Sequence, residues 1–410
     1  MTAVVLDGPQ LLGHLDELST CGRTPGGGVT RPAWSEEDVA AREMVTGWLG
    51  GAGVRARLDA AGNLIAELPG EQAGLAPLAI GSHLDTVVDG GRLDGAYGTV
   101  AAFEIIAALA ACGERLRHPL RAVAWANEEG VTAPPFTGSR AAAGMPVDLE
   151  AVGPDGRRLC ERIAQAGGDP ACFASAALDS LAGYLELHIE QGPVLDRLAL
   201  PIGVVTGSTG ARWGWVRFEG QTNHAGTTPM HLRADALVAA AHAVLAIERL
   251  ATDGPARVAT SGVIEAHPGN ANVVAGRSAV SFDVRSVDEA ALDAAVSRLA
   301  SEVDRIAALT GTTAALATVS SAAAVPTHPV LRSAVSEACA SLGQASRELA
   351  SGAGHDAQHL ARLGPMGMIF VPSIGGISHH PAERTNPEHL IAGAHVLLAA
   401  VRLADERLDP

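Results

Sequence analysis

Histidines and carboxylates occur together in four separate segments of this chain. In the first, residues 81–98 (GSHLDTVVDGGRLDGAYG), a glycine-rich turn after an apolar run carries His83, Asp85 and Asp94. Imidazole and carboxylate groups that converge at the end of a strand suit a divalent metal such as zinc or manganese. Asp before Gly is also common turn chemistry, so this segment alone does not separate a metal site from an ordinary loop.

The second segment, residues 125–130 (WANEEG), ends another apolar run with Glu128 and Glu129. Two neighbouring carboxylates repel each other, so burying both is costly unless cations lie nearby. If the pair faces solvent, the segment is only a charged loop. The sequence therefore leaves both interpretations open at this point.

The third and fourth segments carry the same residue types. Residues 184–196 hold His188 within an apolar strand, with Glu186 and Glu190 on the same pleat face. Residues 375–383 (GGISHHPAE) form a loop that contains His379, His380 and Glu383. Each segment has an ordinary explanation, but the four together offer enough ligands for two metal ions that share a carboxylate.

The elements that must position these side chains alternate between short apolar runs and helical patterns. Ser35, followed by three acidic residues, is typical of a helix N-cap. We expect a strand at 77–85, a helix at 98–112 and a strand at 121–129. This alternation predicts an α/β domain with a mostly parallel sheet, whose sites gather at the carboxyl ends of the strands.

The pattern changes between about Trp213 and Pro326. It predicts a β-α-β-β-α-β order, hence a ferredoxin-like α+β unit, with its first elements at 213–220, 233–251, 256–266, 278–286 and 288–309. The α/β alternation then resumes at 328–342, 366–373 and 389–406. We therefore predict a split α/β domain at 1–208 and 327–410, with a smaller domain inserted at 209–326.

Composition excludes several classes of function. The 410 residues carry a net charge of −16 and no basic patch interleaved with aromatics, which disfavours nucleic acid as a partner. No apolar stretch is long enough to span a membrane, and the acidic N-terminus is unlike a secretory signal, so we expect a cytoplasmic protein. The five cysteines form no CxxC pair and fit a reducing compartment.

The four segments, in this order, resemble the aminoacylase and carboxypeptidase-type family of dinuclear metallohydrolases. The closer likeness is to its hydantoinase/carbamoylase branch, which includes N-carbamoyl-L-amino acid hydrolase, β-ureidopropionase and allantoate amidohydrolase. It is carried by GGGVTR at 26–31, DAAGNLIAELPG at 59–70, LHIEQGPVLD at 187–196, NHAGTTPM at 223–230 and SGAGHDA at 351–357. The resemblance runs from about Thr24 to Ala400.

The resemblance implies two divalent ions per subunit, with zinc expected first and manganese, cobalt or nickel also compatible with the ligands. It implies that one ion is held by His83, His188 and a bridging Asp94, and the other by Glu129, His379 and the same Asp94. Glu128 is implied as the general base that activates the attacking water and later protonates the leaving nitrogen. Asp85 is implied as the carboxylate that orients His83, and His380 as a neighbour of the ligands.

The resemblance also implies residues that bind the substrate. His224 is expected to reach across a homodimer interface and polarise the scissile carbonyl, which makes the inserted domain a dimerisation or lid domain. Asn272 and Arg285 are expected to bind the substrate carboxylate, because the guanidinium fork grips a carboxylate with two hydrogen bonds. The alternative for Arg285 is a surface ion pair. Further expected pocket residues are Gln191, Gly354 and His355.

Two departures from the family pattern bear on substrate choice. The stretch at 131–140 is shorter than usual, and Ala275 stands where proline is frequent. The implied activity is metal-dependent hydrolysis of a linear amide or ureido C–N bond in an N-carbamoyl amino acid or a related ureido acid (allantoate, 3-ureidopropionate), which releases ammonia and CO2. An N-acyl amino acid amidase or a dipeptidase stays open as the alternative. The complete ligand set and Glu128 disfavour a non-catalytic binding protein.

Overall fold

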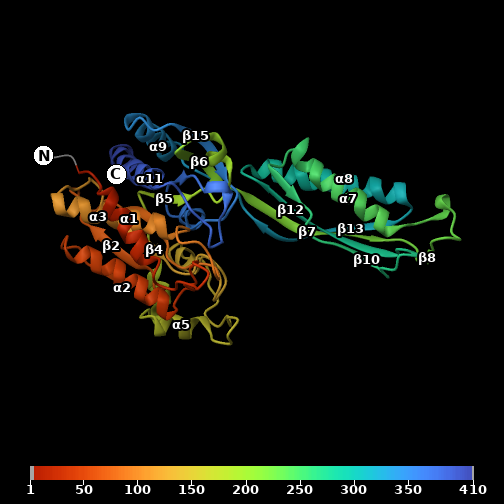
Figure 1. The fold of residues 1–410 in the computed structure, drawn as a ribbon, viewed down its shortest axis with the longest axis horizontal. Coiled ribbons are helices and arrows are strands. Elements are labelled where there is room, and N and C mark those ends of the chain that lie inside the picture. The colour runs from red at the N-terminus through yellow and green to blue at the C-terminus, as the bar shows by residue number, and fades with distance from the viewer. Residues whose placement is uncertain (1–3, 409–410) are drawn as a thin grey trace. The chain divides into compact units, whose positions relative to one another are not determined.

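The structure is a computed structural model that describes residues 4–408 (Figure 1). The chain divides into two compact units. The first comprises the residues up to Thr206 and from Thr327 onward, and the second comprises Gly207–Pro326. Within residues 4–408, no helix is long and apolar enough to cross a membrane. The fold class is the predicted one, a mixed α/β architecture.

The first unit is built on a nine-stranded sheet whose centre is parallel. Strands β4, β3, β5 and β16 lie side by side and run in one direction, and antiparallel strands flank them. The order across the sheet is β1 (Ala56–Leu58), β2 (Leu64–Leu68), β4 (Leu120–Trp125), β3 (Leu78–His83), β5 (Gly183–Ile189), β16 (Met366–Val371), β6 (Ile202–Ser208) and β14 (Val325–Pro326), with β15 (Ser346–Ser351) paired to β6.

The central strands are buried along their whole length, as expected for parallel strands covered on both faces. The main apolar core lies between this sheet and the long helices α1 (Gly8–Leu18), α2 (Glu36–Gly50), α3 (Ala96–Cys112), α9 (Pro329–Ser341) and α11 (Pro387–Arg407). The shorter helices are α4 (Thr137–Ala142), α5 (Leu159–Gln165), α6 (Val194–Leu198), α10 (Asp356–Leu360), η1 (Pro170–Ala176) and η3 (Ile374–Gly376).

The second unit is an antiparallel sheet covered by two helices, α7 (Ala236–Thr252) and α8 (Glu289–Thr310). The strand order is β10 (Ile264–His267), β12 (Arg277–Ser286), β7 (Gly210–Glu219) and β13 (Thr313–Ala322), with β9 (Val258–Thr260) paired to β12. This is the predicted ferredoxin-like arrangement. A separate ribbon joins β8 (Asn223–His224) to β11 (Val273–Val274), and η2 (Met230–Leu232) follows β8.

One expected element is wrong in detail. The strand predicted at 256–266 is two short strands, β9 and β10, separated at 261–263. Both strands pair with β12, and the backbone amides of Gly262 and Val263 donate to the Ser281 hydroxyl between them. The Ser281 hydroxyl therefore accepts from both amides at the break, while the Ser281 amide still donates to the carbonyl of Val263, and an apolar pattern does not reveal such a break.

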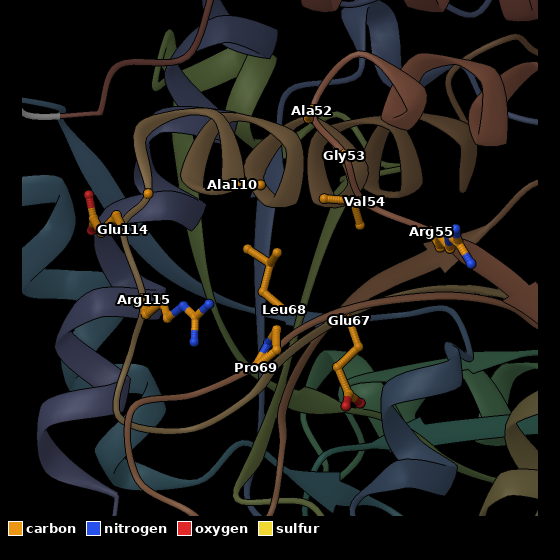
Figure 2. A pocket seen from close by; sticks show the side chains of 11 residues that line it. Ala52, Gly53, Val54, Arg55, Glu67, Leu68, Pro69, Ala110, Glu114 and Arg115 are labelled. Atoms are coloured by element: carbon orange, nitrogen blue, oxygen red, sulfur yellow. The ribbon is translucent and has the colours of Figure 1, made fainter.

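A pocket of about 440 Å³ opens in the first unit where α2 and α3 end and β2 runs into its following loop (Figure 2). Its glutamates are already paired, Glu67 with Arg121 and Glu114 with Arg402. None of the residues in the four histidine- and carboxylate-bearing segments lines it, so this pocket is separate from the candidate ligands.

Candidate metal centre

The parallel strands bring the four chemically active segments to one edge of the sheet. His83 ends β3 and lies in register with Trp125, the last residue of β4, so Glu128 and Glu129 follow at the same edge. His188, near the end of β5, lies in register with Phe370 of β16, and the loop with His379 follows that strand. Strand order thus explains why residues almost 300 positions apart share one site.

Two groups of three ligands meet at Asp94, which lies immediately before α3. His83, Asp94 and His188 form one group, and Asp94, Glu129 and His379 form the other. Oδ1 of Asp94 lies 3.1 Å from Nε2 of His188 and 3.9 Å from Nε2 of His83. Oδ2 lies 3.1 Å from Nε2 of His379. Oδ1 therefore faces the imidazoles of His83 and His188, and Oδ2 faces that of His379, as a bridging ligand requires.

The donor set fits two divalent cations. Imidazole nitrogens and carboxylate oxygens are the ligands of borderline metals. Oε1 of Glu129 is buried and has no hydrogen-bond partner among the described residues, while Oε2 lies 3.6 Å from Nε2 of His379. Burial, followed by the charge of Asp94, raises the pKa of Glu129 to about 8. Nearby cations would relieve both the missing partner and the repulsion.

Glu128 has a similar environment but a different neighbour. Burial raises its pKa well above the usual value, and the carboxylates of Asp356 and Glu129 add to the effect. Its Oε2 lies 3.8 Å from Nε2 of His83, beside the first ligand group. Glu128 and Glu129 thus lie next to different groups of ligands. A carboxyl group that is buried beside a metal centre, but is not itself a metal ligand, is suited to act as a general base.

Asp85 fixes the turn that presents these two glutamates. Its Oδ1 accepts a hydrogen bond from the backbone amide of Glu128 (3.2 Å) and its Oδ2 from that of Glu129 (3.1 Å). The imidazole of His83 bonds through Nδ1 to the backbone carbonyl of Asp85 at 2.9 Å, whereas the carboxylate is 3.9 Å away. Asp85 therefore contacts both ligand loops, and its main-chain carbonyl lies closer to His83 than its carboxylate does.

A second row of buried polar groups supports His188. Its Nδ1 bonds to the carbonyl of Ile189, and its ring packs edge-on against His355 with centroids 4.7 Å apart. Nε2 of His355 lies 2.8 Å from the Ser351 hydroxyl. Glu186 accepts hydrogen bonds from the Ser82 hydroxyl and the amide of Ala357. His355 thus lies behind a ligand, while Glu190, expected on the same face, accepts from the first amides of α6.

A pocket of about 210 Å³ opens directly onto the ligands. Gln191 lines it, with Nε2 donating to Oδ2 of Asp94 at 2.9 Å. Gly354 lines it as well, and an added Cβ there would lie 2.9 Å from Cζ of Phe136. Gln191, Gly354 and His355 were expected here and all three line the pocket, whereas Phe136 was not expected. His380 turns away, because its Nδ1 accepts from the amide of Ala382 and its side chain is exposed.

In the second unit, His224 and Asn272 lie together on the β8–β11 ribbon. The amide of Ala225 donates to the carbonyl of Asn272, and both side chains are exposed. Nδ1 of His224 accepts hydrogen bonds from the amides of Gly226 (3.0 Å) and Thr227 (3.2 Å). In the neutral imidazole the proton is then on Nε2, which is free to donate to a substrate oxygen.

Arg285 lies at the other end of the same unit. It pairs in register with Ala211 near the start of β7, whereas the β8 ribbon follows the end of β7 at Glu219. Its guanidinium is 2.8 Å from Oδ2 of Asp283 and lies over the ring of Trp213 at 5.7 Å. The ion pair expected as the alternative is therefore present, and the half-exposed side chain is held on the strand face.

Comparison with known proteins now assigns the family. Residues 79–403 match the model described as peptidase family M20/M25/M40. The chain belongs to this family. The chain is 37% identical over 402 residues to an N-carbamoyl-L-amino acid amidohydrolase of Geobacillus stearothermophilus, which covers 97% of this chain and 98% of that protein. It is 33% identical over 389 residues to an allantoate amidohydrolase of Bacillus subtilis (strain 168), with 94% of each covered.

Among solved structures, an amidase of the hydantoinase/carbamoylase family from Burkholderia multivorans superposes with a TM-score of 0.91 and 38% identity, with all of both chains covered. These findings confirm the resemblance to the hydantoinase/carbamoylase branch and the expectation of a hydrolase. Membership of the M20 family and the two ligand groups together indicate divalent metal binding.

Sequence reasoning missed the buried Asp356, and it named Glu383 in the fourth segment without giving it a role. Asp356 has no exposed surface, and the charge of its carboxylate contributes to the raised pKa of Glu128. Glu383 accepts hydrogen bonds from the amides of Leu93 and Asp94. Both residues stood in segments already singled out, but an acidic residue in a polar loop carries no sign of burial. Only the folded contacts identify them.

Proposed function

We propose that this M20-family chain hydrolyses the ureido C–N bond of an N-carbamoyl amino acid or a related ureido acid, with two divalent ions bound at the Asp94 centre. The observation that carries the proposal is that one carboxylate, Asp94, is common to two groups of three ligands. The names of the relatives agree with ureido substrates. Zinc is the first candidate and manganese, cobalt and nickel are the others, since the same ligands accept all four.

Ions held by these ligands would lower the pKa of water and offset the negative charge that develops on the scissile carbonyl oxygen. The residues of the chain supply the proton transfers. Glu128 takes the proton from the attacking water and delivers it to the departing nitrogen. The carbamate left by a ureido substrate then decomposes to CO2 and ammonia.

We further propose that the active site is shared within a homodimer. Arg285 and His224 are separated by the length of β7, eight residues from Ala211 to Glu219, which is about 26 Å at the usual rise per strand residue. A small substrate cannot contact both ends of one unit. If Arg285 holds the substrate carboxylate in one subunit, His224 must come from another subunit to donate its Nε2–H to the carbonyl, together with Asn272 beside it.

The direct test is ammonia release from a panel of substrates by enzyme loaded with defined divalent ions. The panel contains N-carbamoyl amino acids, allantoate and 3-ureidopropionate, with N-acetyl amino acids and dipeptides as controls followed by amine release. Turnover of at least one ureido acid, well above all N-acyl controls, is the expected result. Preference for N-acyl compounds or dipeptides would instead identify the alternative activity, an amidase or dipeptidase of the same superfamily.

A further inference from the structure

The loop that carries the bridging ligand and the loop that carries His379 are joined by one buried side chain. Oε1 of Glu383 accepts hydrogen bonds from the backbone amides of Leu93 (2.9 Å) and Asp94 (3.1 Å). Oε2 lies 3.1 Å from the hydroxyl of Ser378, the residue before His379. That hydroxyl is also 3.2 Å from Oδ2 of Asp94. Glu383 thus contacts the main chain of one metal ligand and the neighbour of another.

The chain makes room for this contact. A Cβ added to Gly91 would lie 2.0 Å from Oε1 and Cδ of Glu383, so only glycine allows the carboxylate to approach this loop. Glu383 is 5% exposed, and its three hydrogen bonds account for the burial of an acidic group in a loop. The arrangement therefore depends on two separate positions, Gly91 and Glu383, which lie in different loops.

We infer that Glu383 is a positioning residue. It holds the loop of His379 so that His379 lies next to Oδ2 of Asp94, which completes the ligand group of Asp94, Glu129 and His379. The two ligand groups differ in their need for such support. His83 and His188 lie on β3 and β5, within the sheet. His379 lies on a loop, with φ of +55° and a half-exposed side chain, so nothing in regular secondary structure fixes it.

This inference rests on the proposed metal centre. One titration distinguishes a failure of the metal centre from a failure of the role of Glu383. Chelator-stripped protein is titrated with Co²⁺ by calorimetry, first in its natural sequence. Fewer than two bound ions per chain would contradict the metal centre itself. If two bind, Glu383→Ala should weaken the second, looser ion by about 10- to 100-fold, the usual cost of removing a group that orients a ligand, and affect the first ion less.

Conservative and matched variants distinguish positioning from charge. Glu383→Gln retains the geometry, since its amide oxygen can accept from Leu93 and Asp94 while its NH₂ group donates to Ser378. We expect it to lose less than about tenfold in affinity for the second ion. Glu388→Ala removes an exposed carboxylate from the first turn of α11 and should bind both ions normally.

Gly91→Ala provides an independent test, because its Cβ would displace the carboxylate without changing Glu383. It should reproduce the loss seen in Glu383→Ala, whereas Gly26→Ala, whose Cβ would come no closer than 3.7 Å to any neighbour, should not. If Glu383→Ala does not fold, Gly91→Ala and Glu383→Gln carry the comparison. Unchanged Co²⁺ binding in Glu383→Ala or in Gly91→Ala, or a Gln variant as weak as the Ala variant, would overturn the inference.

Discussion

Glu128 and Glu129 are adjacent in the sequence but belong to different parts of the site. The backbone amides of both are held by the carboxylate of Asp85, which sets the turn between them. Glu129 then faces His379, and Glu128 faces His83. The repulsion that the sequence predicts for this pair is reflected in the raised pKa of each, and bound cations would relieve it.

The division of roles predicts opposite effects of two isosteric substitutions. Glu128→Gln removes the base but no ligand, so it should retain both ions and lose roughly 10²- to 10⁴-fold in kcat. Glu129→Gln weakens a ligand group and should lose bound metal as well as activity. Metal analysis of the purified variants, alongside their kcat, tests this. An active Glu128→Gln enzyme would exclude Glu128 as the base.

The lowered pKa of His359 predicts one part of the pH dependence of the free energy of unfolding. Burial lowers its pKa from 6.5 to about 4, with Arg140 and Arg362 adding to the shift, and its ring packs on Phe136. The unfolded chain therefore binds a proton at a higher pH than the folded one. The contribution of His359 to stability should be complete above about pH 6.5 and should fall by about 1 to 3 kcal/mol as the pH drops towards 4.

His359→Gln removes this ionisation while keeping a polar side chain. The variant should lose less stability than the natural protein between pH 7 and pH 5, as measured by urea unfolding at each pH. Other buried histidines, among them His355, also have lowered pKa values, so the dependence should become weaker without vanishing. An identical pH dependence in both proteins would show that His359 does not contribute.

Sequence patterns predicted individual residues unevenly. The structure brings together six predicted residues: His83, Asp94, Glu128, Glu129, His188 and His379. They were predictable because each lies near the end of a recognisable strand or in the loop that follows it. Glu383, Asp356 and Phe136 were not predicted as functional neighbours. Their positions depend on how loops fold over one another, and a loop sequence carries no periodicity that reports burial. The assigned roles of the site residues stay predictions.

Among the elements, α3 matters most to the site because its first residues follow Asp94. Gly95 precedes the helix with φ of +62°, and an added Cβ would lie 2.3 Å from the His83 ring. Gly113 ends the same helix with a similar φ of +68°, and nothing lies within 4 Å of its added Cβ. The two glycines therefore share a positive φ, but Gly113 lies in the left-handed region (ψ of 16°) whereas Gly95 does not (ψ of −48°), and they differ in what surrounds them.

Alanine substitutions at Gly95 and Gly113 therefore compare two positions of positive φ, only one of which contacts a metal ligand. Gly113→Ala should cost about 1 kcal/mol of stability and leave metal binding intact. Gly95→Ala should carry more strain, because a ψ of −48° lies outside the left-handed region, and it also pushes His83 out of place, so it should lose most metal binding and activity. Thermal unfolding and metal analysis of both variants measure the two effects. Equal metal content in the two variants would contradict the packing of Gly95 against His83.

The helices and strands were largely predictable where hydrophobic periodicity is long. The α/β alternation of the first unit and the β-α-β-β-α-β order of the second are both present. The prediction failed at 256–266, because the break between β9 and β10 arises from Ser281 on another strand. Small elements such as β15 (SRELAS) and α10 (DAQHL) were not predicted at all, because neither contains a continuous apolar run.

At the scale of the whole molecule, two predicted substrate-binding residues lie far apart, at the two ends of the inserted unit, and one small substrate cannot reach both within one chain. Arg285 and the His224 ribbon lie at opposite ends of the sheet formed by β7 and β12. Sharing between subunits would resolve this separation and is our proposal. The predicted domain limits of 208 and 327 lie close to the limits of the two compact units, and their catalytic and dimerising roles stay proposals. A cytoplasmic location also stays a prediction.

Hybrid dimers test the sharing. His224→Ala and Glu128→Gln subunits are each expected to be nearly inactive alone. After verified exchange, a mixed dimer has one site with an intact Glu128 and an intact His224 from the other subunit. A random equal mixture should therefore recover roughly a quarter of the natural activity. If exchange is complete and no activity returns, His224 does not act across the interface.

The central claim is that hydrolysis depends on a pair of ions held around Asp94. The most direct measurement is a titration of chelator-stripped enzyme with Zn²⁺, in which ammonia release from an N-carbamoyl amino acid is followed against bound metal. We predict no turnover without metal and a rise that is complete only near two ions per chain, one for each ligand group. Full turnover of the metal-free enzyme, or saturation at one ion per chain, would contradict the account.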